Sequence, residues 1–223
     1  MITAEKGVGL IMKVQKVKNR GYLFTFYNSP DWDLNIHLIM GKKHNFLIDT
    51  GLGSLCMAPI IENIDNSKPI IVINTHYHWD HIWGNGVFKD SIIISHKLCR
   101  EIIDSKWDDM LNKNKHYSYG DVEKALPNLV FEKELYFPED KIRIIYTPGH
   151  TIDCISVVDE EEKVINVGDN IGDTIDGIVP DVCEKELYVD TLLKYKEIDF
   201  NTCISGHNVV LGKEIIEKII KIL

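Results

Sequence analysis

The stretch that decides the fold is Asn74-Thr75-His76-Tyr77-His78-Trp79-Asp80-His81, which follows an apolar run of the strand type. It contains three imidazoles and one carboxylate, the ligand types that zinc, iron and manganese share in proteins. If the strand continues, His76 and His78 point to the same side, because alternate side chains of a strand do so. A loop would then bring Asp80 and His81 to a position close by. The spacing therefore predicts two adjacent metal ions, one held by each of these pairs.

The composition limits the class of protein. The chain has 223 residues, of which 44% are apolar and 26% charged, as in globular domains. Its net charge of −9 argues against a nucleic-acid or anionic-membrane surface, because phosphate binding needs a basic stripe. No segment approaches the ~18 apolar residues of a membrane span. We therefore expect a single domain over residues 1–223 that acts on a small molecule.

The cysteines and the start of the chain indicate in which cellular compartment the protein is expected. The five cysteines are odd in number and scattered, without a Cys-x-x-Cys pair. This pattern indicates reduced thiols rather than a disulfide scaffold. The first residues have the character of a strand and lack a signal-peptide cleavage site. Both observations favour a cytoplasmic location.

Hydrophobic patterning predicts strands and helices along the whole chain. The expected strands are Leu10–Val17, Tyr22–Tyr27, Leu34–Met40, Asn45–Asp49, Ile70–Asn74, Ser91–Ser95, Leu129–Phe131, Ile142–Tyr146, Ile155–Asp159, Val164–Val167 and Thr202–Ser205. The expected helices are Ser54–Asp65, His96–Leu111, Lys185–Ile198 and Lys213–Ile222. The polar and aromatic stretch Asn112–Gly120 predicts an exposed loop or a substrate lid.

The two halves of the chain have similar patterns. In the first half a strand, an acidic turn at Asp49, a helix and a second strand lead to His76. In the second half the same order runs from the turn at Asp169 to His207. Two such halves, packed sheet on sheet with helices outside, predict an α/β fold that is a four-layer αββα sandwich. Strand ends from both halves would then meet at one edge, where such folds place their sites.

Three further polar residues each follow an apolar strand at a turn that contains glycine: His150, Asp169 and His207. Glycine lets the backbone approach a metal closely. Alone, each residue is more often structural, but together with the histidine cluster they complete a site. His150 becomes the third ligand of the first ion, and His207 joins Asp80 and His81 on the second. Asp169 bridges both ions, and each ion keeps a position open for water, as catalytic zinc requires.

These residues give the chain a resemblance to the metallo-β-lactamase fold superfamily of metallohydrolases. Its five motifs occur here in order: Asp49 in Leu-Ile-Asp-Thr-Gly, His76-x-His78-x-Asp80-His81, His150 in Thr-Pro-Gly-His-Thr, Asp169 in Gly-Asp, and His207 in Ser-Gly-His. The resemblance spans nearly the whole chain. It implies an αββα sandwich with a dinuclear site in a shallow groove. It also implies that Asp49 orders the histidine loop without binding metal, as supporting carboxylates do.

The expected chemistry is metal-dependent hydrolysis. Two divalent ions about 3.5 Å apart share a hydroxide and lower the pKa of its parent water toward neutrality. Zinc is favoured, and iron and manganese fit the same ligands. Asp80 is expected to accept a hydrogen bond from the attacking hydroxide, which makes it the catalytic carboxylate. We expect a glyoxalase II-like enzyme that cleaves a small-molecule thioester, ester or lactone, with a phosphodiester as the alternative.

The resemblance narrows the reaction through features that this chain has or lacks. True β-lactamases of the superfamily generally lack the bridging residue that is Asp169 here. The acyl-homoserine lactonases have a tyrosine soon after that residue, and Asn170–Asp173 contains none, although Tyr117 or Tyr119 could substitute. A second class, the iron-dependent redox enzymes of this fold, includes sulfur dioxygenases and oxygen reductases. The complete set of seven ligands argues against the first, and His78 in place of glutamate argues against the second.

Residues beside the motifs have two interpretations each. Trp79 and Trp83 flank the ligands, and they either line the groove or pack in the core beneath it. Trp107 and Met110 fit a core or an interface. Cys183 follows Asp169 in a loop that could bring it to the site, but it is expected to be a buried apolar residue.

Overall fold

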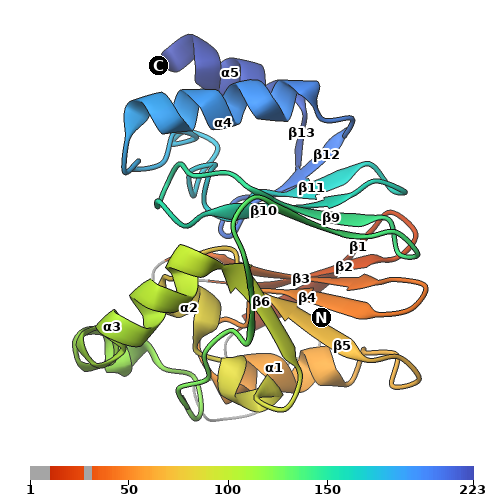
Figure 1. The fold of residues 1–223 in the computed structure, drawn as a ribbon, viewed down its shortest axis with the longest axis vertical. Coiled ribbons are helices and arrows are strands. Elements are labelled where there is room, and N and C mark those ends of the chain that lie inside the picture. The colour runs from red at the N-terminus through yellow and green to blue at the C-terminus, as the bar shows by residue number, and fades with distance from the viewer. Residues whose placement is uncertain (1–10, 28–31) are drawn as a thin grey trace.

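The chain, described by a computed structural model over residues 11–27 and 32–223, folds into four layers (Figure 1). Two β-sheets pack face to face, and helices lie on the outer side of each sheet. This arrangement confirms the α/β, four-layer αββα sandwich. Among the described residues, no helix combines the length and apolar character that crossing a bilayer requires.

The first sheet runs from β1 to β7 in chain order. Neighbouring strands pair antiparallel as far as β4 and parallel from there to β7. Its strands are β1 (Ile11–Val17), β2 (Gly21–Tyr27), β3 (Leu34–Met40), β4 (Asn45–Ile48), β5 (Ile70–Ile73), β6 (Ile92–His96) and β7 (Leu129–Phe131).

The second sheet has the order β13-β12-β11-β10-β9-β8. Only the β11–β12 pair is parallel among its described pairs. Its strands are β8 (Glu134–Phe137), β9 (Ile142–Tyr146), β10 (Ile155–Asp159), β11 (Val164–Asn166), β12 (Thr202–Ile204) and β13 (Leu211–Gly212).

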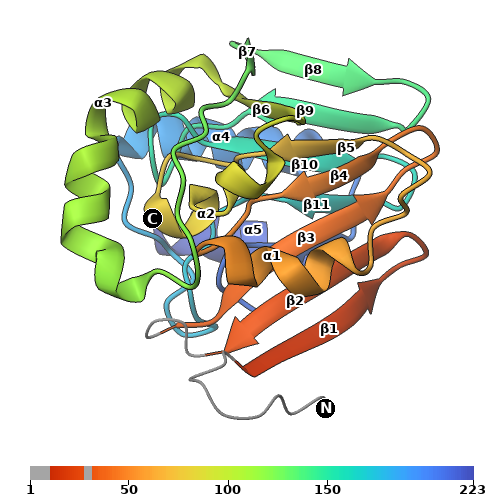
Figure 2. The ribbon, with the colours of Figure 1, turned by 90° about the horizontal axis from the view of Figure 1, so that it is seen from below.

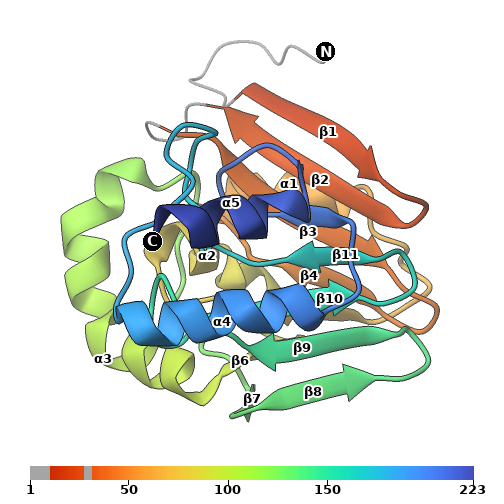
Figure 3. The ribbon, with the colours of Figure 1, turned by 90° about the horizontal axis from the view of Figure 1, so that it is seen from above.

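Helices cover both sheets from outside. Figure 2 shows α1 (Ser54–Ile61) over the first sheet, with α2 (Trp79–Ile82) and α3 (Lys97–Asn114) toward one end of it. Figure 3 shows α4 (Lys185–Glu197) and α5 (Glu214–Ile222) over the second sheet. Two short 3-10 turns, η1 (Asn85–Phe88) and η2 (Lys115–Tyr117), follow α2 and α3.

The core explains why the central strands are apolar at nearly every position. Ile71 and Ile73 of β5 share one buried cluster with Ile144 and Val157 of the second sheet. Val72, between them, packs in a different cluster that contains side chains of α1. Both faces of β5 are therefore covered, and a strand covered on both faces loses the alternation of apolar and polar residues. This strand leads directly into the histidine cluster.

Several predicted boundaries were wrong. The first helix ends at Ile61 rather than Asp65, shortly after Pro59. Helix α3 continues to Asn114, so the stretch predicted as the loop Asn112–Gly120 begins as helix and passes through η2. Strands β8 and β13 were not predicted. Cys183 is exposed rather than buried, and the predicted strand residue Leu10 lies outside the described residues.

Candidate metal centre

The residues that follow four strands meet at one edge of the sandwich. The chain leaves β5 into the stretch from His76 to His81, and it leaves β9, β11 and β12 into His150, Asp169 and His207. The structure brings all seven predicted side chains into two adjacent groups. Their role as metal ligands remains a prediction, but the placement that this role requires is present.

The first group combines His76, His78 and His150 with Asp169, and one ligand atom of each lies within 4.8 Å of the others. The Nε2 atom of His150 is 3.1 Å from the Nδ1 atom of His78. Two ring nitrogens this close, each aimed at the other, have the geometry of ligands that converge on one ion. We call this set the first group.

The second group consists of Asp80, His81 and His207, whose ligand atoms also lie within 4.8 Å of one another. The Nε2 atoms of His81 and His207 are 3.4 Å apart. Asp80 and His81 lie on helix α2, not on the loop that the sequence predicted. The helical turn nevertheless places these two side chains in the second group, apart from His76 and His78.

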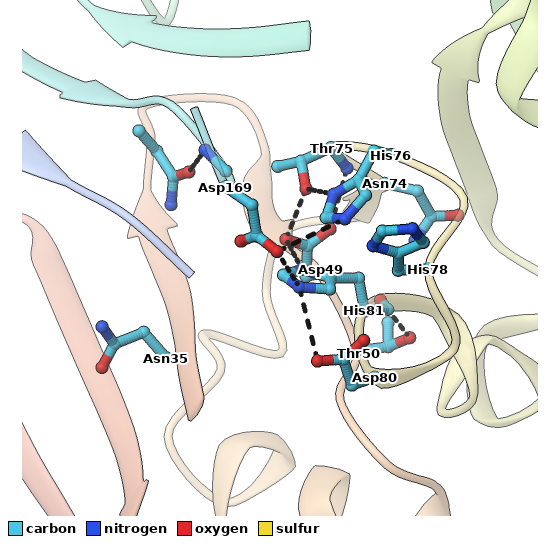
Figure 4. Close-up of polar contacts among 12 residues, drawn as sticks. Asn35, Asp49, Thr50, Asn74, Thr75, His76, His78, Asp80, His81 and Asp169 are labelled. Carbon is cyan, nitrogen blue, oxygen red and sulfur yellow. Dashed lines mark hydrogen bonds and ion pairs between the residues drawn. The ribbon is translucent and has the colours of Figure 1, made fainter. Parts of the chain in front are cut away.

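Asp169 links the two groups through a single oxygen. Its Oδ2 atom is 3.4 Å from Nε2 of His76 and 3.9 Å from Nε2 of His150, in the first group. The same atom is 3.2 Å from Nε2 of both His81 and His207, in the second group. Figure 4 shows the carboxylate pointing toward His76 and His81. This is the position that the sequence predicted for a bridging residue.

The buried Asp49 fixes the orientation of both groups from behind (Figure 4). Its Oδ2 atom is 2.8 Å from Nδ1 of His81. It also accepts a hydrogen bond of 2.8 Å from the Thr75 hydroxyl, which is 3.0 Å from Nδ1 of His76. Asp49 holds a backbone φ of 64°, a conformation that aspartate tolerates better than most residues. Such support fixes the ring orientation of a metal-binding histidine.

Two backbone carbonyls orient the remaining imidazoles. His150 donates from Nδ1 to the carbonyl oxygen of Asp181 at 2.8 Å, and His207 donates from Nδ1 to that of Asp33 at 2.9 Å. A carbonyl can only accept, so each Nδ1 carries a proton, and in the neutral form of either ring Nε2 has the lone pair. In both residues the Nε2 atom is the one that faces the other ligands.

The donor set fits a bound metal. The Nε2 atom of His76 and the Oδ1 atom of Asp169 are buried and have no hydrogen-bond partner. A buried polar atom without a partner costs about 1–3 kcal/mol, and such atoms are rare in folded proteins. Coordination of an ion would satisfy a nitrogen lone pair and a carboxylate oxygen at this position.

Burial and charge give the two groups opposite proton affinities. In the first group, burial lowers the pKa of His76 far below its usual range and that of His78 to about 4. In the second group, burial also favours the neutral form, but the nearby carboxylates, Asp169 first, outweigh it. They raise the pKa of His81 well above its usual value and that of His207 to about 9. Burial acts to raise the pKa of Asp169, but the imidazoles, His81 first, hold it well below its usual range.

Sequence reasoning left out two residues of the site, Thr75 and Trp32. It also left open whether Trp79 and Trp83 line the site or pack in the core. Thr75 links Asp49 to His76, and its position directly before the motif was the available signal. Trp32 lies with its ring centroid 5.9 Å from that of His207, and no local pattern points to it. Trp83 is fully buried in a core cluster, whereas Trp79 is half-buried beside the ligands.

Comparison with known proteins gives a consistent picture. The family model described as the Metallo-beta-lactamase superfamily matches residues 30–207. A protein of Methanocaldococcus jannaschii named "Probable metallo-hydrolase" is 27% identical over 175 residues, which cover 78% of this chain and 70% of that protein. A hydroxyacylglutathione hydrolase of Nitrobacter hamburgensis is 29% identical over 148 residues, which cover 63% of this chain and 49% of that protein.

Solved structures share the fold at lower identity. A metallo-beta-lactamase from Pontibacter korlensis superposes with a TM-score of 0.74 at 15% identity, and the match covers 95% of this chain and 99% of that chain. Identity this low is evidence for the shared sandwich alone.

Proposed function

The chain belongs to the metallo-beta-lactamase superfamily of metallo-hydrolases, and from this premise we propose that it hydrolyses a small-molecule thioester, ester or lactone with two divalent metal ions. The observation that carries the proposal is the position of Asp169. One carboxylate oxygen lies within 3.9 Å of imidazole nitrogens from both groups. A site for one ion would not need a carboxylate between two sets of histidines.

Each group would hold one ion, for which we propose zinc. His76, His78 and His150 would hold the first, Asp80, His81 and His207 the second, and Asp169 both. Ions bound there would lower the pKa of water toward neutrality and polarise the carbonyl of the substrate. With ions bound, the histidines would act as neutral nitrogen ligands, and hydrogen bonds to Asp49, Thr75 and two backbone carbonyls hold their rings in place.

Asp80 is the proposed catalytic carboxylate. Its Oδ2 atom is 3.5 Å from Nε2 of His207 and 3.8 Å from Nε2 of His81, so one oxygen is directed at the second group. A carboxylate can accept hydrogen bonds at both oxygens. Asp80 would therefore orient the attacking water by accepting a hydrogen bond from it. It lies at the start of the short helix α2, which fixes its backbone.

The substrate class rests on charge and on the relatives. A net charge of −9 disfavours a nucleic acid, so a small acyl compound is proposed over a nucleic-acid phosphodiester. The hydroxyacylglutathione hydrolase among the relatives is named for an acyl thiol compound, which supports acyl transfer to water as the reaction. We propose a cytoplasmic enzyme, consistent with its five unpaired cysteines.

Metal content and hydrolysis test the proposal together. The protein is purified without chelators or added metal, and its ions are counted by mass spectrometry. About two zinc or manganese ions per chain, with turnover of at least one thioester, ester or lactone, is the expected result. Asp169→Ala should lose both ions, while the matched control Asp176→Ala, an exposed acid of the same loop, should keep them. A single iron per chain and no hydrolysis would favour the redox class and overturn the proposal.

A further inference from the structure

A row of aromatic rings begins at the second group and leads away from it. The Trp32 ring meets His207 edge-on, with centroids 5.9 Å apart and planes at 84°. Trp79 lies 6.4 Å from Trp32 at 61°, and Tyr117 stacks on Trp79 at 5.4 Å and 12°. We call Trp32, Trp79 and Tyr117 the aromatic wall. The metal-ligand groups need His207 but none of these three rings.

The rings of the aromatic wall are each half-buried, so every ring offers some surface that the protein does not cover. Trp79 is supported from behind by the fully buried Trp83, with centroids 4.9 Å apart. The indole nitrogen of Trp32 is covered and has no hydrogen-bond partner, so Trp32 contributes chiefly an apolar surface. Half-exposed rings beside a cluster of ligands are typical of small-molecule sites, which are lined by aromatic side chains.

The segment that carries Tyr117 is fixed in place. Tyr119 donates from its backbone N–H to the carbonyl of Leu52 at 2.9 Å and accepts from the backbone N–H of Leu55 at 3.1 Å. Asp121 accepts from the N–H of Ser54 at 3.0 Å and donates to the Ser54 hydroxyl oxygen at 2.9 Å. Four hydrogen bonds therefore tie this segment to the start of α1. They favour a rigid wall over the mobile lid that the sequence suggests.

Two glycines allow this close approach. Gly53 has a φ of 138°, and a Cβ atom there would lie 2.7 Å from the carbonyl oxygen of Tyr119. Gly120 has a φ of 87°, and a Cβ atom there would lie 2.5 Å from the Ser54 hydroxyl oxygen. Both positions combine a left-handed backbone with a close contact, so a side chain at either would push the segment away. The position of Tyr117 therefore depends on backbone packing and not on the ring stack alone.

The charged side chains that interact with the seven predicted ligands bear on the charge of the substrate. Among the described residues, no lysine or arginine forms a hydrogen bond or ion pair with the seven predicted ligands. Asp173, a carboxylate in the loop after Asp169, interacts electrostatically with the ligands. A negatively charged acyl group would meet this carboxylate without a fixed partner of opposite sign.

We propose that the aromatic wall binds the uncharged, apolar acyl group of the substrate, with flat aromatic acyl groups preferred. This inference rests on the proposed function, because it places the scissile carbonyl at the metal-ligand groups and the acyl group beside the second of them. Stacking on Tyr117 and Trp79 supplies the preference for flat groups, since aromatic pairs are stabilised beyond the area that they bury.

Two esters with the same leaving group test the proposal. The metal-loaded protein is given para-nitrophenyl acetate and para-nitrophenyl phenylacetate, and kcat/KM is measured for each. The ratio of the two values should favour phenylacetate, and Tyr117→Leu and Trp32→Leu should each reduce that ratio by about tenfold, mainly through KM. Tyr136→Leu serves as the matched control, because Tyr136 is an exposed tyrosine on β8 of the second sheet. Metal content is measured in every variant.

A second measurement does not depend on catalysis. Metal-free protein is titrated with phenylacetamide, a neutral aromatic ligand, and the quenching of tryptophan fluorescence is followed. Binding should weaken about tenfold in Tyr117→Leu and stay unchanged in Tyr136→Leu. If neither ester is cleaved but phenylacetamide binds as expected, the proposed reaction fails and the aromatic wall stands. If the ester ratio is unchanged in both wall variants while metal content is normal, the aromatic wall proposal is wrong.

Discussion

The two groups of ligands use the same residue types in different environments. In the first group His150 leaves 18% of its side chain exposed, and His78 is also half-buried. In the second group the side chains of His81 and His207 are 0% and 5% exposed. The first group contains three imidazoles, whereas the second has a carboxylate of its own and Asp49 behind it.

This difference shows that environment, more than residue type, sets the properties of a ligand. The same burial that keeps His78 neutral is outweighed at His207 by the carboxylate of Asp169. Without ions, the first group is therefore ready to bind metal, and the second must first release protons. The first group is also the more accessible to a substrate.

The largest expected effect is the loss of metal from both groups, which removes the difference between them. Asp169→Ala removes the oxygen that both groups share, so both should lose their ion, and hydrolysis should fall by about a thousandfold or more. His76→Ala should abolish hydrolysis as well, through the first group. Metal analysis and initial rates measure both effects, and circular dichroism should show an intact fold. Retained activity in either variant would remove the mechanism.

A change of pH should separate the two groups. Binding an ion to the second group displaces a proton from His207, whose pKa is raised to about 9. The pKa of His81 in this group is also raised, so affinity there should rise at least tenfold per pH unit, which is at least about a hundredfold between pH 6 and pH 8. The affinity of the first group should change less over this range, because the pKa values of His76 and His78 are already lowered, that of His78 to about 4. Calorimetry in buffers of different ionisation enthalpy counts the protons released. Equal release in both binding steps would contradict the contrast.

Asp49→Asn should weaken the second group selectively. Asparagine tolerates the left-handed backbone of this position but lacks the charge that faces His81. Loss of such a supporting carboxylate typically lowers metal affinity by 10–100-fold. Competition with a chromogenic chelator measures the two affinities separately. The exposed Asp176→Asn is the control, and an equal loss in both groups would show that Asp49 supports them equally.

The smallest expected effect concerns the link between the groups. Thr75→Val keeps the shape of the side chain but removes the hydroxyl between Asp49 and His76. We expect a loss of only a few-fold in the affinity of the first group, since one neutral hydrogen bond contributes about 1 kcal/mol. The same chelator competition detects it. A larger loss than in Asp49→Asn would mean that Thr75, and not Asp49, is the main support.

Local motifs made the candidate site readable from sequence. His76, His78, Asp80 and His81 are nearly consecutive, and the other ligands follow apolar strands at turns. The fold followed because strands covered on both faces are apolar throughout, as β5 is. That residues 1–223 form one domain remains a prediction.

Features without a local signal were missed. Strand β8 contains the alternating residues Glu134, Leu135, Tyr136 and Phe137 at the edge of its sheet, where one exposed face weakens the hydrophobic pattern. Helix α2 is four residues long, too short to show a helical period. Trp32 reaches His207 across 175 positions of chain (207 − 32), and no periodicity encodes such a contact.

The origin of the ligands in both sheets has a thermodynamic consequence. His76 to His81 follow a strand of the first sheet, and the other ligands follow strands of the second. Ions that bind only when the two sheets are docked stabilise the docked state, by about 4 kcal/mol at a free concentration a thousand times Kd. Amide hydrogens near the ends of β5 and β12 should therefore exchange more slowly in the metal-loaded protein. The supply of metal in the cell would therefore add to the stability that the shared core gives to the contact between the two sheets.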